Sequence, residues 1–216
     1  MKYNISYKIQ KIDSKAKAYI LGFICCNSSI SHSRVEVSIE KQDREVLDYI
    51  SKEIDCDVFV YNTFDAKARR FPRACCSKKI PDIKAFVGGE KKADRHLPIV
   101  AKQLNRYLLL GAFDADGCLT WGRRKDRNRI WQKISFTTSL NIAICIQQLL
   151  IKEVNISTVV RPKTNCNCYV VEFSNKKDVL KFIDYIYPDD FVVLKRKYLK
   201  TKALRLELEE NGEGAA

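Results

Sequence analysis

Apolar and polar positions along the first half of the chain follow a helix–strand–strand order that occurs twice. Asp13 and Ser14 are typical helix N-cap residues and precede the first apolar stretch. The periodicity predicts, in chain order, a helix at 16–24, a strand at 34–39, a helix at 43–54, β-rich segments at 58–61 and 73–76, and a helix opening at 77–80.

The second half repeats this order. A helix is expected from Lys102 to Phe113, after the natural break at Pro98. The segments that follow are a strand at 133–138, a helix at 140–154, strands at 158–161 and 169–173, and a helix opening at 174–178. An amphipathic helix, first basic and then acidic, is expected from Phe191 to Glu210. With the strand residues that directly follow each motif, such as Ser29 and Ser31 in the first half and Trp121 and Arg123 in the second, both halves predict the order αββαββα.

Two short segments also align without gaps, residues 21–30 with residues 110–119, at an offset of 89. Matching flanks on both sides indicate duplication and a pseudo-two-fold axis. We expect an α+β protein with one repeat at 1–98 and a second at 99–216. A pseudo-symmetric surface suits a nucleic-acid duplex, whose strands are themselves related by two-fold axes.

Composition favours a polyanionic partner. Hydrophobic residues make up 46% of the 216 residues, enough for a packed core, and the net charge is +13. Basic side chains in clusters displace counterions from phosphates, although charge also serves solubility alone. No apolar run is long enough to span a bilayer and no secretion signal is visible. We expect a protein of the prokaryotic or phage-infected cytoplasm, or of an organelle, with no membrane partner.

The nine cysteines predict reduced thiols rather than a disulfide framework. Adjacent pairs such as Cys25-Cys26 point different ways on regular structure and rarely bridge. Cys166 and Cys168 resemble half of a metal site, but no Cys-x-x-Cys pair or nearby His completes it. Structural zinc is therefore not expected.

Residues 109–117, Leu-Leu-Gly-Ala-Phe-Asp-Ala-Asp-Gly, resemble the signature of the LAGLIDADG homing endonucleases, and residues 20–28 resemble a degenerate version. Lys195-Arg196-Lys197-Tyr198 resembles the sequence that ends a repeat in this family, so the resemblance covers nearly the whole chain. It implies two pseudo-symmetric repeats with antiparallel β-saddles over DNA. It also implies site-specific, metal-dependent phosphodiester hydrolysis by a monomer on long double-stranded DNA targets.

Small residues on both motif helices would let their backbones approach closely. In the family, the acids at the helix ends then lie side by side and bind a divalent metal, usually Mg²⁺, with Mn²⁺ or Ca²⁺ as alternatives. The resemblance assigns these positions to Asp116, Asn27, Ser28 and Gly117. Gly117 is expected to relieve the turn out of the helix. Asp114 is expected to support helix packing or the turn.

The first motif departs from the signature. Asn27 stands where Asp116 stands in the second copy, Ser28 replaces the glycine, and Cys25 replaces the other acid. One acid suits an enzyme that nicks a single strand. Loss of the site suits a non-cleaving DNA-binding protein or an intron RNA maturase. An unrelated basic α/β protein with a chance motif is disfavoured by the double repeat.

Basic residues near each motif are candidates for catalysis or for DNA binding. Lys92 and Lys197 are the expected counterparts of the family's catalytic cations, with exposed phosphate-binding cations as the alternative. Alternating side chains on the strands are expected to reach a DNA groove. These are Ser29, Ser31, Arg34, Glu36, Ser38, Arg69, Arg70 and Arg73 in the first repeat, and Trp121, Arg123, Arg124, Lys125, Arg127, Arg129, Lys133, Arg161 and Lys163 in the second.

Overall fold

The computed structural model describes residues 11–64, 70–124, 129–164, 166–187, 191 and 193–210. The chain divides into two compact units, Met1–Ala115 and Asp116–Ala216. The first unit therefore includes almost all of the second motif helix. The boundary expected between residues 98 and 99 concerns the sequence duplication, and it stays a prediction.

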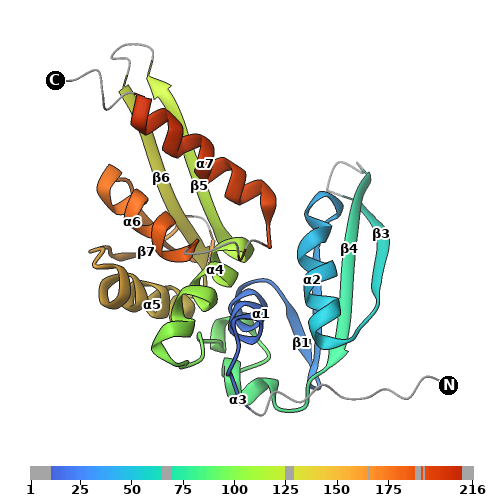
Figure 1. Ribbon diagram of the computed structural model, residues 1–216. Coiled ribbons are helices and arrows are strands. Elements are labelled where there is room, and N and C mark those ends of the chain that lie inside the picture. The colour runs from blue at the N-terminus through green and yellow to red at the C-terminus, as the bar shows by residue number, and fades with distance from the viewer. Residues whose placement is uncertain are drawn as a thin grey trace. The chain divides into compact units, whose positions relative to one another are not determined.

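The first unit holds a four-stranded antiparallel sheet in the order β1-β2-β4-β3 (Figure 1). Its elements are α1 (Lys15–Cys26), β1 (Ser29–Ser31), β2 (Arg34–Glu40), α2 (Arg44–Ile54), β3 (Val58–Phe64), β4 (Arg70–Lys79), α3 (Ile83–Val87) and α4 (Asn105–Asp116), of which only Asp116 falls in the second unit. Helix α2 packs against β2, β3 and β4. Val35, Val37 and Ile39 of β2 are buried toward it, which is the alternation expected from the sequence.

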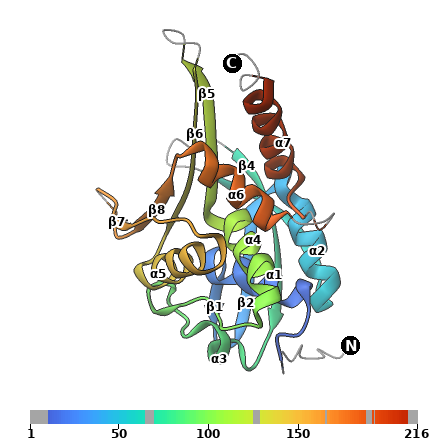
Figure 2. The same ribbon diagram turned by 60° about the vertical axis from the view of Figure 1, so that its left-hand side comes forward.

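The second unit repeats this topology with the strand order β5-β6-β8-β7. Its elements are β5 (Gly117–Arg124), β6 (Arg129–Thr138), α5 (Leu140–Leu149), a π-helical turn (Leu150–Val154), β7 (Val160–Pro162), β8 (Tyr169–Phe173), α6 (Lys176–Ile186) and α7 (Lys195–Glu210). Helix α5 packs against β6, β7 and β8, as Figure 2 shows, and α7 packs along β5. The predicted α+β fold of two αββαββα repeats is confirmed.

Several element boundaries differ from the sequence expectation. Residues 77–80 do not open a helix, because Ser77 to Lys79 continue β4 and α3 begins at Ile83. Lys78 lies on the same face of β4 as buried Cys76, and its ammonium group donates to the carbonyl of Asp55. This hydrogen bond lets a lysine occupy a buried position in the strand. The last helix begins at Lys195 instead of Phe191. Among the described helices, none is long and apolar enough to cross a membrane.

Helices α1 and α4 approach until their backbones touch. A Cβ atom on Gly22 would lie 2.1 Å from the carbonyl oxygen of Leu108, and one on Gly111 would lie 2.0 Å from that of Tyr19. Both distances are far inside any real Cβ contact, so only glycine fits at either position. The close packing expected from the small residues of the two motifs is confirmed.

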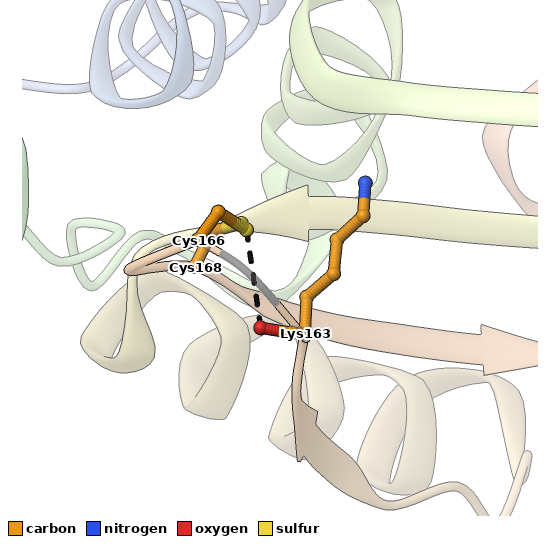
Figure 3. The surroundings of a disulfide bond; sticks show 3 residues. All are labelled: Lys163, Cys166 and Cys168. Carbon is orange, nitrogen blue, oxygen red and sulfur yellow. Dashed lines mark hydrogen bonds between the residues drawn. A yellow bond between two sulfur atoms is a disulfide. The ribbon is translucent and has the colours of Figure 1, made fainter.

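Cys166 and Cys168 form a disulfide in the turn between β7 and β8 (Figure 3), so the expectation of reduced thiols is wrong for this pair. Their Cα atoms lie 5.4 Å apart, within the usual disulfide range of roughly 4.4–6.8 Å. The expectation assumed regular structure, whereas this turn reverses the chain: the Lys163 amide donates to the Cys168 carbonyl at 2.9 Å. The described cysteines outside this turn are not disulfide-bonded.

The α1–α4 contact makes a prediction about Gly111. An alanine inside a helix is ordinarily favoured over glycine by about 1 kcal/mol. Here we expect Gly111→Ala to lower the free energy of unfolding by about 3 kcal/mol or more, because the methyl group meets backbone. Urea unfolding followed by circular dichroism measures the change.

Gly122→Ala is the matched control for this experiment. Its Cβ would meet Trp131 Nε1 at 3.1 Å, at the edge of a side chain that can shift. We expect a change below about 1 kcal/mol. Equal losses in the two variants would contradict the role given to the α1–α4 contact.

Candidate functional site

The two acids of the second motif have different surroundings. Asp114 is 5% exposed, and the Tyr19 hydroxyl donates to its Oδ2 at 2.9 Å across the α1–α4 contact. Tyr19 is itself fixed by an edge-on contact with Tyr49, at 5.7 Å between ring centroids. Asp114 therefore joins the two helices, as expected from the sequence. Asp116, one half-turn later, is half-buried at the helix end.

The chain runs from α4 directly into β5 at Gly117. The carbonyl oxygen of Gly117 accepts a hydrogen bond from Lys197 Nζ at 2.6 Å. Gly117 does not use the left-handed region to make the turn out of the helix, since Gly88 is the glycine with positive φ among the described residues. The helix end at Asp116 is held instead by a lysine from α7.

The end of α1 is built from neutral groups. The Asn27 amide closes the helix onto Phe23 O at 2.8 Å, and Ser28 Oγ donates to Ile24 O at 2.6 Å. The Cys25 thiol donates to the His96 carbonyl at 3.3 Å. Asn27, Ser28 and Cys25, at which the first motif departs from the signature, therefore each form a hydrogen bond at the end of α1.

Arg95 lies against this helix end and is 2% exposed. Its Nη1 donates to Ser28 O at 3.0 Å, to Ser28 Oγ at 3.2 Å and to Ile24 O at 3.3 Å, while Nη2 donates to Glu90 O at 2.6 Å. Burial lowers the pKa of the guanidinium, but arginine still carries its proton at neutral pH. The negative end of the α1 dipole favours this cation.

The expected catalytic lysines are placed differently. Lys197 is half-buried on α7 and bonded to Gly117, whereas Lys92 is exposed in the short 3-10 turn Lys92–Asp94. The residue that contacts the end of the first motif is Arg95, which the sequence reasoning missed. The two motifs align at an offset of 89, whereas Arg95 and Lys197 are 102 positions apart. The sequence alignment therefore does not pair these two cations.

One face of the first sheet is covered by α2, and the other, which we call the first open face, carries polar side chains. Strand register places six of the expected DNA-binding residues together on it: Ser29, Ser31, Arg34, Glu36, Ser38 and Arg73. Arg73 donates to Ser38 O at 2.6 Å and Arg34 to Ser77 Oγ at 3.1 Å. Arg70 lies in β4, and Arg69 lies outside the described residues.

The second sheet has a corresponding second open face. Register places Lys133 and Arg161 on it, with Lys163 exposed just after β7. Arg124 is the last residue of β5 and Arg129 the first residue of β6. Lys133 forms an ion pair with Glu172 at 3.2 Å. Lys125 and Arg127 lie outside the described residues.

Trp121 and Arg123 do not lie on this open face, so their expected position is wrong. Both share the face of buried Leu119, since side chains alternate along β5. Arg123 donates to Glu207 of α7 at 2.7 Å. Contact with α7 therefore determines which side chains of β5 face the core, and the local sequence pattern does not.

The open faces also include residues that the sequence reasoning did not select. They are Phe59, Tyr61, Ser77, Lys79, Thr120, Trp131 and Ser135. Trp131 is 43% exposed and lies over Gly122 of the neighbouring strand. Trp131 lies two residues before Lys133 on the same face of β6, so extending the predicted strand at 133–138 by two residues would have identified it.

The oxygen atoms available to a divalent cation differ between the two motifs. Mg²⁺ takes one or two carboxylates and completes its shell with waters and phosphate oxygens. Asp116 fits this requirement, although no three His, Cys, Asp or Glu side chains gather into a metal-binding group in the part of the chain described. Ser28 does not fit, because its two oxygen atoms already accept from Arg95. The expected approach of Asn27 to Asp116 spans the two units and stays a prediction.

Known structures with the same fold are LAGLIDADG proteins. The homing endonuclease I-WcaI bound to its DNA recognition sequence is similar at a TM-score of 0.61 and 14% identity, covering 89% of each chain. I-SmaMI bound to cleaved DNA gives 0.61 and 10%, over 94% of this chain and 91% of that one. The N-terminal LAGLIDADG domain of DUF199/WhiA gives 0.54 and 12%, over 83% and 85%.

These similarities define the class: the chain has the fold of the single-chain LAGLIDADG homing endonucleases. Residues 103–187 match the family model described as LAGLIDADG-like domain. No curated protein sequence matches the chain.

The Tyr19–Asp114 hydrogen bond generates a prediction. Tyr19→Phe leaves a buried carboxylate oxygen without its donor, and we expect the free energy of unfolding to fall by about 1–3 kcal/mol. Tyr61→Phe is the control, because its hydroxyl bonds Ser38 at an exposed position. Urea titrations of both variants test this, and a larger loss for Tyr61→Phe would refute it.

Proposed function

We propose that the protein is a site-specific DNA endonuclease of the LAGLIDADG homing type, acting as a monomer on double-stranded DNA. A divalent cation, Mg²⁺ or its substitutes Mn²⁺ and Ca²⁺, would be held by Asp116 together with phosphate oxygens. The observation that carries the proposal is the position of Asp116 at the end of α4, beside the Lys197–Gly117 contact. Two polar open faces and a net charge of +13 support a DNA partner.

The bound cation would supply Lewis-acid stabilisation of charge on the scissile phosphate. Asp116 would orient it, and Lys197 would hold the carbonyl of the next residue so that the carboxylate keeps its place. Because Asn27 replaces the corresponding acid, we propose that the protein nicks one strand of its target. Loss of the first acid also favours a second candidate, a non-cleaving DNA-binding protein or intron RNA maturase.

Selection from a pool of randomised duplexes supplies the target, which is then placed in a supercoiled plasmid. With Mg²⁺ we expect a nicked circle and no linear product. Asp116→Asn is expected to lower the nicking rate about a hundredfold or more, because it removes the only proposed carboxylate ligand.

Asp48→Asn, at an exposed ion pair of α2, is the control and should nick like the wild type. Target binding without nicking would favour the second candidate. Linear product from the wild type would overturn the assignment of single-strand cleavage.

Two tryptophans on opposite faces of the second sheet allow a direct test of the DNA surface. We expect the selected duplex to quench Trp131 fluorescence on the open face while leaving Trp121 unchanged. Quenching should therefore persist in Trp121→Phe and disappear in Trp131→Phe. Binding should also weaken with added salt, as for any phosphate contact. Quenching that survives in Trp131→Phe would place the DNA elsewhere.

A further inference from the structure

The two motif helices end at cations that occupy equivalent positions. In the duplicated sequence Ser28 aligns with Gly117, at the offset of 89. Arg95 donates to the carbonyl of Ser28 at 3.0 Å, and Lys197 donates to the carbonyl of Gly117 at 2.6 Å. Each repeat therefore closes its motif with a basic side chain from a later segment, bonded to the same backbone atom.

The surroundings of the two cations differ in accessibility and in charge. Lys197 is half-buried, and Asp116 lies next to the carbonyl that Lys197 binds. Arg95 is 2% exposed, and the acceptors recorded for it are the neutral oxygen atoms of Ile24, Ser28 and Glu90. The Cys25 thiol, at the position of Asp114, is directed to the His96 carbonyl.

From this arrangement we infer that Arg95 is the resident cation of the first motif and excludes a divalent metal from the end of α1, which leaves Asp116 as the basis of a single metal site. The guanidinium takes both oxygen atoms of Ser28 and the carbonyl of Ile24, which a metal there would need. A fixed positive charge at the end of α1 also repels a divalent cation. The inference rests on the proposed function, because it concerns the metal of that site.

This inference assigns the asymmetry to a residue outside both motifs. Restoring the missing acid would then be insufficient, since the carboxylate of Asn27→Asp would enter the field of Arg95. The acid and the removal of Arg95 are required together. In the first motif the Arg95 side chain therefore stands where a metal would bind, and the motif serves helix packing alone.

Iron-directed cleavage of the protein tests the inference without any DNA. The full chain is loaded with Fe²⁺ in place of Mg²⁺ and treated with ascorbate and peroxide, so that hydroxyl radicals cut the backbone near the metal. We expect cuts around residues 114–118 that Asp116→Asn and excess Mg²⁺ each reduce by about tenfold or more, because the carboxylate of Asp116 is the proposed ligand.

Each pattern of cuts has a distinct meaning. Cuts around residues 25–29 that persist in Asp116→Asn would overturn the inference and leave the proposed endonuclease intact. Absence of specific cuts at either motif would overturn the metal site itself, and with it the metal-dependent function.

Variants then test Arg95 directly. Asn27→Asp should add no cuts near residue 27, whereas Asn27→Asp combined with Arg95→Met should add them. New cuts in Asn27→Asp alone would refute the blocking role of Arg95. Circular dichroism checks folding, and Arg95→Gln replaces Arg95→Met in the double variant if the latter does not fold, because its amide can still bond the Ser28 carbonyl.

Discussion

The backbones of α1 and α4 touch at Gly22 and Gly111, and this contact constrains most of what surrounds the candidate site. At these two glycines no side chain separates the helices, so their relative rotation and offset are set by main-chain atoms. This arrangement holds the Tyr19 hydroxyl and the Asp114 carboxylate at hydrogen-bonding distance. Sheet strands begin almost immediately after each helix, at Ser29 and at Gly117. The end of α1 and the strand β1 that follows it are therefore positioned by this contact.

Much of this architecture could be predicted from the sequence, because periodicity and duplication are local or repeated signals. Both αββαββα orders, the tight helix packing and the supporting place of Asp114 follow from such signals. The positions of Trp121 and Arg123 could not be predicted in this way. Their face depends on α7, whose Glu207 meets Arg123 from 84 residues away. Arg95 was missed for a similar reason, since only the folded chain brings it to Ile24 and Ser28.

The comparison of the two repeats shows how a duplicated unit diverges. The strand orders are identical, yet the polar groups at the helix ends have been replaced one by one with other hydrogen bonds. Buried polar atoms must be satisfied, so a lost acid in one repeat requires a new partner for its neighbours. The arginine and the thiol at the end of α1 meet that requirement, which keeps the helix end in place without an acid.

The alternation along β2 and β6 separates two kinds of information on the same strand. Val35, Val37 and Ile39 determine how the strand packs, while Arg34, Glu36 and Ser38 between them lie on the open face. Substitutions at the second set are expected to change the polar groups of that face with small effects on stability. Under the proposed function, exchanging every other residue of the strand would change the binding preference and leave the packing intact, which suits such a surface to redesign.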